Sequence, residues 1–414
     1  MILAQCTLLL VVNLMFTGFK DNVVNLQAQR AWLATLMRRF VISSTNKDTL
    51  LSMEMKSVQP NDQWRSWIRS ESGRRLAYCF AGVDPSFTAT DYEQMLPSHD
   101  TLWQSRSEGE WKSLSHLLND QTPPMSLKKI FSLNWMSNGV LQQVSEFNKL
   151  ILNLMLFVEE RRAIEASRSC ALFEEEPTFS TKSALSPSYR RLDWKYKLLA
   201  PKPFEPSERT GNSDARNIFY HLIGILRHVP RKQLYAYSGW YASEEDMTAA
   251  EAYLAGWISE NPVFSRECLV HAGALIGQIR SNGPAACYHY FCLLIATSYI
   301  WTFTRLQEQG SKELEGRPPL QPPATLLRID QRHDPSLRDR WVENASGTLV
   351  HVTGVGMLSS QGSAERLWKE FLQIMGSRVG WPTLREGMIR CTSELLKNSS
   401  PMKGMRYSNS EVSH

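Results

Sequence analysis

Apolar residues recur every three or four positions along most of the 414-residue chain, and alternating strand patterns are nearly absent. Such spacing places apolar side chains on one face of an α-helix. We therefore predict an all-α fold, a multi-helix bundle or array with two long irregular connections. The predicted helices span residues 21–41, 62–83, 108–118, 138–166, 218–228, 244–259, 264–279, 284–307, 363–375 and 383–396.

Two stretches rich in proline and polar or charged residues interrupt these helices. Residues 174–217 are typical of a long surface connection, and residues 309–338 are typical of a second loop. We predict an N-terminal helical half over residues 1–173, an irregular linker over 174–217, a C-terminal helical half over 218–397 and a disordered tail over 398–414.

The first nineteen residues are largely apolar, but polar Gln5, Thr7 and Asn13 interrupt them. The segment lacks the basic start and the small-residue cleavage site of a signal peptide, and it is short for a membrane span of about 20 residues. We expect a buried core helix that ends near Gly18. A chain that opens inside a core helix suggests a natural start further upstream.

The composition excludes several classes of protein. Apolar residues make up 43% of the chain, which is ample for a core, and 46 basic against 41 acidic residues give a net charge of only +5. Nucleic-acid-binding modules usually carry a clustered basic face, which is not evident here. The cysteines are odd in number, widely spaced and without a CxxC pair, which favours reduced thiols in the cytosol or nucleus: Cys6, Cys79, Cys170, Cys268, Cys287, Cys292 and Cys391.

One short segment offers possible metal ligands. Cys287, His289 and Cys292 cluster in AACYHYFCLL. On a helix, His289 and Cys292 would share a face, but Cys287 would not, and no second Cys/His pair follows at zinc-finger spacing. We interpret them as buried residues of a core helix.

Two further patterns suggest enzyme chemistry only weakly. Gly354 and Gly356 follow a short apolar run and precede a helix, as in a dinucleotide-binding loop, but Ser359 stands at the third glycine position. We expect a turn between helices, or a bend in a packed helix. Magnesium-dependent isoprenoid cyclases need oxygen ligands at helical spacing, and neither available set has that pattern: Asp330, Asp334 and Asp339 in a loop, and Asn138, Gln142 and Glu146 on one helical face.

The most informative stretch is residues 64–84, WRSWIRSESGRRLAYCFAGVD. Trp64 and Trp67 recur at helical spacing with several other apolar residues. Glu71 is followed by Arg74 and Arg75 at the spacings that allow ion pairs along a helix. Exposed pairs of this kind contribute only about 0.3–0.5 kcal/mol. We interpret the segment as an amphipathic helix whose ion pairs fix its orientation.

That pattern, WxxWIxxExxRRLxYxxFxxD with Phe80 one residue early, resembles the signature of the fungal-specific transcription factor regulatory domain, also called the middle homology region. The signature residues are Trp64, Trp67, Glu71, Arg74, Arg75 and Asp84. Other segments resemble the family in the same order: 4–18 with 27–29, Leu96-Pro97 with Leu102-Trp103 and Glu110-Trp111, IFYHLIGILRHV at 218–229, and 349–372 with Trp381.

The resemblance implies a helical regulatory module that controls transcription by RNA polymerase II in the nucleus. It is greatest to members whose DNA-binding part holds two-Cys, two-His zinc fingers, but this chain contains no such finger and no six-cysteine zinc cluster. We therefore expect zinc and DNA contacts only in a module outside these residues. The implied partners are the transcriptional machinery, co-regulators or a second copy of the chain, with no membrane. We assign no catalytic, cofactor-binding or metal-binding residue within it.

Two alternative functions stay open from the sequence. The first alternative is an all-α metabolic enzyme, either cyclase-like or nucleotide-dependent. The second is a degenerate paralogue that binds a full-length partner and blocks it. The helical content and the Gly354 turn motivate the first alternative, and the missing zinc module motivates the second.

Overall fold

The computed structural model describes residues 60–81, 95–119, 125–132, 141, 144–171, 187–201, 211–239, 242–283, 285–312, 325–345, 347–378 and 380–399. Within these ranges the chain forms 14 helices and one three-stranded sheet. The prediction of a mostly helical fold is confirmed, and the small sheet is an addition to it. The expected helices over 1–19 and 21–41, Asp84 and residues 400–414 of the predicted tail lie outside the described residues.

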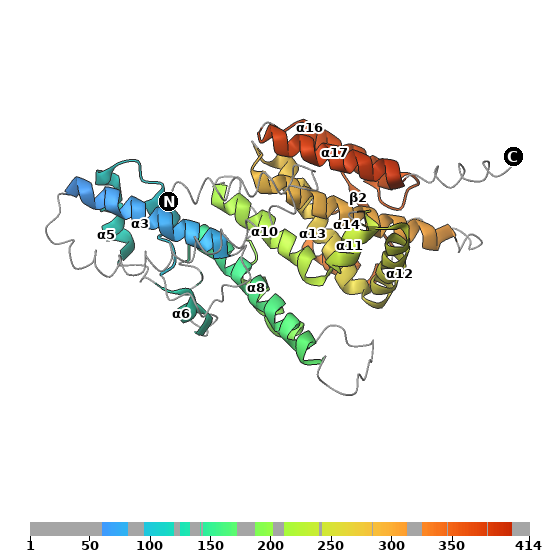
Figure 1. Ribbon diagram of the computed structural model, residues 1–414, viewed down its shortest axis with the longest axis horizontal. Helices are drawn as coiled ribbons and strands as arrows, with labels where there is room; N and C mark the ends of the chain where they lie inside the picture. Colours follow the sequence, from blue (N-terminus) through green and yellow to red (C-terminus); the bar gives the residue numbers. More distant parts are fainter. Residues whose placement is uncertain are drawn as a thin grey trace, which may run out of the picture. The chain divides into compact units, whose positions relative to one another are not determined.

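The described residues divide into two compact units, with the boundary between Tyr220 and His221 inside α10. Unit 1 holds the earlier elements: α3 (Pro60–Ala81), α4 (Asp100–Trp103), α5 (Glu108–Asn119), α6 (Leu127–Ser132), α8 (Glu146–Ala171), α9 (Pro187–Leu198) and the first half of α10 (Gly211–His228) (Figure 1). Helix α8 packs against both α3 and α9. Its fully buried side chains, among them Leu152, Met155 and Leu156, form much of the core of this unit.

Unit 2 is built around α14 (Cys287–Lys312), which packs against at least five other helices of the described ranges. These neighbours include α11 (Arg231–Tyr237), α12 (Glu244–Glu260), α13 (Pro262–Ser281), α16 (Ser363–Gly376) and α17 (Pro382–Ser399), of which α16 and α17 lie side by side (Figure 1). The buried side chains of α14 include Cys292, Leu293, Ile295, Ala296, Tyr299, Ile300 and Phe303. Helix α16 turns Leu367, Trp368 and Phe371 inward at helical spacing, and Trp368 meets Trp301 of α14.

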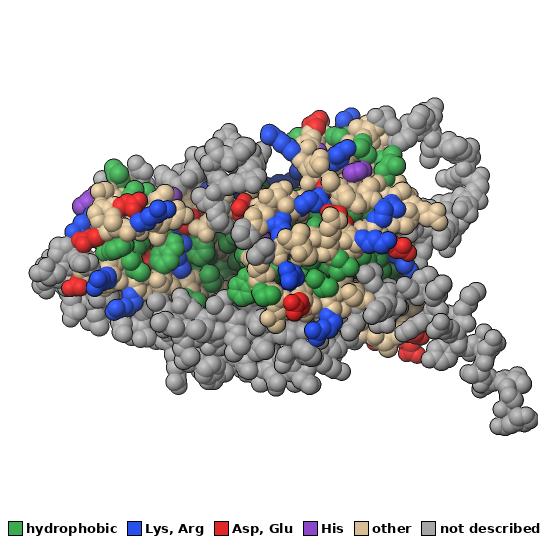
Figure 2. Space-filling view, turned by 90° about the horizontal axis from the view of Figure 1, so that it is seen from above, with side chains coloured by type: hydrophobic (Ala, Val, Ile, Leu, Met, Phe, Trp, Pro, Cys, Tyr) green, Lys and Arg blue, Asp and Glu red, His purple; other side chains and the backbone are tan. Residues whose placement is uncertain are grey.

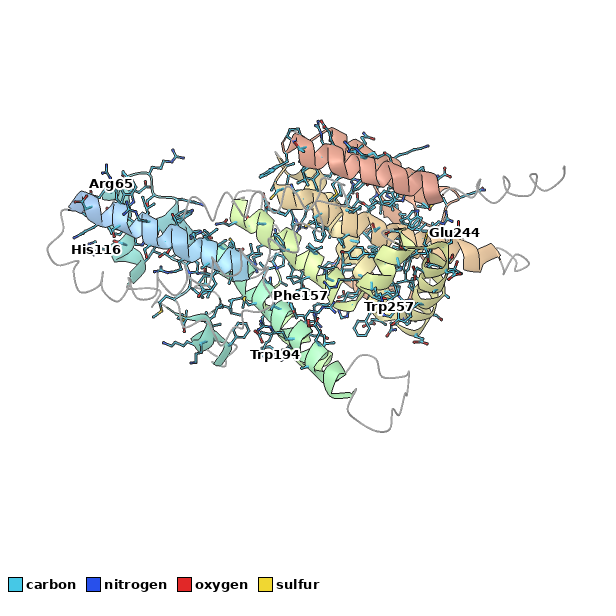
Figure 3. All side chains as sticks on the ribbon, in the orientation of Figure 1. Arg65, His116, Phe157, Trp194, Glu244 and Trp257 are labelled. Carbon is cyan, nitrogen blue, oxygen red and sulfur yellow. The ribbon has the colours of Figure 1, made fainter. Side chains whose placement is uncertain are left out.

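Helix ends in unit 2 follow from local capping. The Ser243 hydroxyl accepts a hydrogen bond from the Asp246 N–H, and the Asp246 carboxylate accepts one from the Ser243 N–H, which is a capping box that starts α12. Glu244 stands in the first turn of this helix and Trp257 near its end (Figure 3). Pro262 then begins α13, where its missing N–H is not needed.

A small sheet forms where the sequence predicted a loop over residues 309–338 and a turn between helices at Gly354 and Gly356. Strand β1 (Thr325–Arg328) pairs parallel with β2 (Thr348–Val352) through a crossover that contains α15 (Pro335–Asn344), and β2 pairs antiparallel with β3 (Gly356–Met357). Residues 309–338 are therefore not one loop, and Gly354 and Gly356 belong to a β-hairpin instead of a turn between helices. Gly354 has φ +82°, a left-handed conformation that glycine adopts without strain.

The predicted linker over 174–217 is not wholly irregular. Helix α9 occupies Pro187–Leu198, and α10 begins at Gly211, upstream of the predicted Ile218. Helix α8 begins at Glu146, later than predicted, because the Ser145 hydroxyl accepts a hydrogen bond from the Asn148 N–H and caps the helix there. None of the helices in the described ranges is both long enough and apolar enough to cross a bilayer.

Candidate functional site

The predicted signature helix is α3, and its charged residues form a buried cluster within unit 1. Glu71 is fully buried and its carboxylate accepts four hydrogen bonds. Arg74 Nη1 donates at 2.8 Å and Arg75 Nε at 3.0 Å, while the N–H and hydroxyl of Ser98 donate at 2.9 and 3.1 Å. A buried carboxylate is tolerated when it is paired and fully hydrogen-bonded, as Glu71 is here.

Arg75 extends this cluster to two further segments of the chain. Its Nη2 atom donates to the carbonyl oxygen of Ser98 at 2.9 Å and to Asp100 Oδ1 at 3.2 Å. The guanidinium lies 4.8 Å from the ring centroid of Trp103 and 4.7 Å from that of Phe147. Only 8% of Arg75 is exposed, so these cation–π contacts are largely screened from water.

Asp100 and Asn148 join the same cluster to the start of α8. Asp100 Oδ2 accepts a hydrogen bond from the Phe147 N–H at 3.1 Å, and Asn148 Nδ2 donates to the Pro97 carbonyl at 2.8 Å. We refer to Glu71, Arg75, Ser98, Asp100 and Asn148 as the α3 cluster. It ties α3, the segment 96–100 and α8 together through side chains that are far apart in sequence.

The signature tryptophans pack beside the cluster. The Trp67 ring lies 6.4 Å from that of Trp103 and 5.6 Å from that of Trp111, in tilted geometry. Such aromatic pairs stabilise a fold beyond the area they bury. Trp64 is half-buried and stands one turn earlier on α3, whereas Arg65 on the same helix and His116 on α5 are exposed (Figure 3).

The structure changes the expectation for the α3 ion pairs. They were expected to be exposed and weak, but Glu71 and Arg75 are buried. Sequence reasoning also missed Ser98, Asp100 and Asn148. The available signal was the polar pair in LPSHDTLW, because Ser98 and Asp100 lie between the Leu96-Pro97 and Leu102-Trp103 motifs. The carboxylate oxygens of Glu71 and Asp100 all accept hydrogen bonds from within the protein. The cluster therefore holds α3 and α8 in place.

The Cys287, His289 and Cys292 side chains do not converge as a set of metal ligands. Cys292 is fully buried on α14, and burial raises the pKa of its thiol, which disfavours the thiolate that zinc requires. His289 Nδ1 accepts a hydrogen bond from the Ala286 N–H, and burial lowers the pKa of His289 to about 4. Across the described ranges, no three His, Cys, Asp or Glu side chains converge as metal ligands.

The glycine hairpin after β2 is covered by acidic side chains. The Glu370 carboxylate of α16 occupies the space over Gly354. Arg280 pairs with Glu370 Oε1 at 3.0 Å and with Asp330 Oδ2 at 2.6 Å, and also donates to the Thr353 carbonyl at 2.9 Å. A dinucleotide phosphate at Gly354 would meet the Glu370 carboxylate, so this hairpin is unsuited to that ligand.

The candidate magnesium ligands are also dispersed. Asp330 is engaged by Arg280, Asp334 caps α15 by accepting from the Ser336 N–H, and Asp339 pairs with Arg338. Of the other set, Glu146 pairs with Lys149 and with Arg216. Asn138 and Gln142 lie outside the described residues.

A partly buried histidine pair in unit 2 predicts a pH-dependent stability. The Nδ1 atoms of His221 and His271 lie 2.9 Å apart, which requires one to donate and the other to accept. Burial lowers the pKa of His221 to about 4 and that of His271 well below its usual value. Neighbouring cationic groups act in the same direction: Arg227, His228, His333 and Arg338.

We therefore expect unit 2 to lose stability as the pH falls from about 6.5 towards 4, because the unfolded histidines take up protons that the folded pair excludes. His221 alone accounts for about 2 kcal/mol between pH 7.5 and pH 5. Urea unfolding at a series of pH values measures this slope. The variant His221→Gln should flatten the slope, whereas His116→Gln, at an exposed histidine, should leave it unchanged. An equal slope in all three proteins would contradict the role of the pair.

Comparison with known proteins finds distant similarity to fungal transcription factors. No protein-family profile matches it, and no solved structure matches it. It is 22% identical over 390 residues to a transcription factor of Gibberella fujikuroi, which covers 92% of this chain and 47% of that protein. It is 27% identical over 141 residues to the transcription factor opdJ of Penicillium oxalicum, covering 32% of this chain and 16% of that one. Transcription factor 1 of Elsinoe fawcettii is 31% identical over 110 residues, covering 24% of this chain and 12% of that one.

The chain is distantly homologous to fungal transcription factors over much of its length. It spans about half the length of the first of these relatives and a smaller share of the others. These proteins are named as regulators of transcription, which favours a non-enzymatic role for the homologous chain.

Proposed function

We propose that the chain is the regulatory module of a fungal transcription factor, which controls transcription by RNA polymerase II in the nucleus through protein contacts. The observation that carries this proposal is the homology to the Gibberella fujikuroi transcription factor along 92% of the chain. In this proposal zinc binding and DNA recognition belong to a part of the protein outside these 414 residues. The partners are components of the transcriptional machinery, co-regulators or a second copy of the chain.

The described surface supports contacts with proteins more than with DNA. Basic and acidic side chains are interspersed on the face seen in Figure 2, in keeping with the small net charge of +5. Apolar side chains are exposed in both units, including Leu117 on α5 and Tyr253 on α12, which are 63% and 53% exposed. The α3 cluster would keep α3 and the start of α8 in fixed positions within unit 1.

The enzymatic alternative finds little support in the described residues, in either its cyclase-like or its nucleotide-dependent form. Glu370 opposes a phosphate at Gly354, and Asp330, Asp334 and Asp339 each serve a different local contact. Calorimetric titration with magnesium or with a dinucleotide tests both forms. Binding of either at millimolar concentration would favour an enzyme over the proposed module.

A transcription reporter tests the proposed function. We expect the full chain, fused to an unrelated DNA-binding domain, to change the output of a reporter that carries the matching operator by several-fold relative to that domain alone. The fused Glu71→Gln variant should lose this effect if the folded module is needed, whereas Glu108→Gln should keep it. A fusion that folds and occupies the operator without changing output would overturn the proposal. Co-purification of two differently tagged copies separates self-association from contacts with other proteins.

A further inference from the structure

A cavity of about 370 Å³ lies within unit 2, where α12, α13, α14, α15 and β2 meet. Exposed Gln307, Ala345 and Ser359 are among its lining residues, so the cavity opens to solvent on their side. Small-molecule sites usually measure about 300–1,000 Å³ and have mostly apolar walls with a few polar groups. The wall combines apolar and polar side chains in nearly equal measure. The apolar ones are Leu269, Phe303, Trp341, Leu349, Val350 and Leu358, and the polar ones include Ser265, Arg266, Gln307, Thr348 and Ser359.

Arg266 is the charged residue in this wall, and its position is fixed. Its Nε atom donates to the Val342 carbonyl at 2.7 Å, and Nη2 donates to the Glu343 carbonyl at 2.9 Å. Both acceptors stand at the C-terminal end of α15, where carbonyl oxygens lack partners within the helix. These two bonds hold the guanidinium rigidly beside the cavity.

The charge of Arg266 is not matched by an anion of the protein. Within the described ranges, no carboxylate pairs with Arg266, and its Nη1 atom has no acceptor. Burial lowers the pKa of Arg266, although a guanidinium stays protonated at neutral pH. An unpaired, partly buried positive charge beside an apolar space is best satisfied by a carboxylate, which Arg binds with strong charge-assisted hydrogen bonds.

We propose that this cavity binds a small, largely apolar carboxylic acid, whose carboxylate accepts hydrogen bonds from Arg266 and whose hydrocarbon part packs against Phe303 and Trp341. The neutral alcohol of the same chain length would gain the apolar contacts but not the ion pair. If the chain regulates transcription as proposed above, such an acid would act as its effector, but binding itself does not depend on that role.

Calorimetric titration of the full chain with decanoate and with 1-decanol, both below their aggregation limits, tests this proposal. We expect decanoate to bind more tightly than 1-decanol. The variant Arg266→Gln should weaken decanoate binding by about ten- to a hundredfold and leave 1-decanol binding nearly unchanged. Decanoate should also raise the melting temperature of the unchanged chain.

A second variant keeps the test decisive if Arg266→Gln fails to fold. Thr348→Phe fills the cavity from β2 without touching the bonds of Arg266, and it should abolish binding of both probes. Arg328→Gln, at an exposed position on β1, serves as the matched control and should bind as the unchanged chain does. The absence of decanoate binding at millimolar concentration, or equal binding by Thr348→Phe, would overturn the proposal.

Discussion

The variant Glu71→Gln is expected to lower the free energy of unfolding of unit 1 by about 3–5 kcal/mol, because it leaves two arginines without their buried carboxylate. Glutamine has nearly the same shape, so the loss reports charge and hydrogen bonding more than packing. Its amide nitrogen would also face the donors Arg75 and Ser98, which now bond to carboxylate oxygens. Urea unfolding, followed by the near-ultraviolet signal of the packed tryptophans, measures the effect.

Glu108→Gln provides the matched control for this prediction. Glu108 pairs with Lys112 at 2.6 Å on α5, but both side chains are partly open to solvent. Exposed pairs of this kind contribute less than about 1 kcal/mol. An equal loss of stability in the two variants would contradict this prediction, because the buried ion pairs of Glu71 would then contribute no more than an exposed pair.

The second large effect is expected from Gly277→Ala in α13. A Cβ atom at this position would overlap the carbonyl oxygen of Asp330, which follows β1 and rests directly on the helix. Because the obstacle is backbone, it cannot swing aside as the end of a side chain can. We expect a loss of about 2–3 kcal/mol in the stability of unit 2, the cost of forcing an extra methyl group into a packed contact. Thermal unfolding measures this loss.

Gly256→Ala is the control for this second prediction, since Gly256 also lies inside a helix but has open space where a Cβ atom would stand. Alanine there should stabilise the protein by about 0.5–1 kcal/mol, because it favours the helical conformation. Opposite signs for the two glycines are the expected outcome. A stabilising Gly277→Ala would mean that Asp330 does not rest on α13.

Helices with strong local signals were predictable from the sequence. The predicted ranges 244–259 and 363–375 each end one residue short of the helices that form, α12 and α16. Local capping and clear apolar spacing decide such elements. Helix α9 was missed because proline, serine and charge surround it, although Leu192, Tyr196 and Leu199 carry a helical spacing.

The sheet could not be predicted in the same way. Strand β1 has four residues and β2 has five, too few for a clear alternating pattern. Their pairing, in which Thr325 lies beside Thr348, depends on the crossover through α15 that leads from Arg328 to Thr348. The α3 cluster likewise combines a local feature with long-range ones. The spacing of Glu71 and Arg75 is visible in the sequence. Their burial depends on Asp100 and Phe147, which no local pattern connects to them.

The ionic contacts of Arg280 affect the order in which unit 2 can fold during synthesis. Its three partners, Asp330, Thr353 and Glu370, follow it by 50 to 90 residues along the chain. When α13 leaves the ribosome, the guanidinium therefore has none of them, and its last partner is added only with α16. Domains generally fold as units during synthesis. Unit 2 can therefore complete the ionic contacts of Arg280 only after α16 has been made, and a nascent chain halted before Glu370 would lack the last of them.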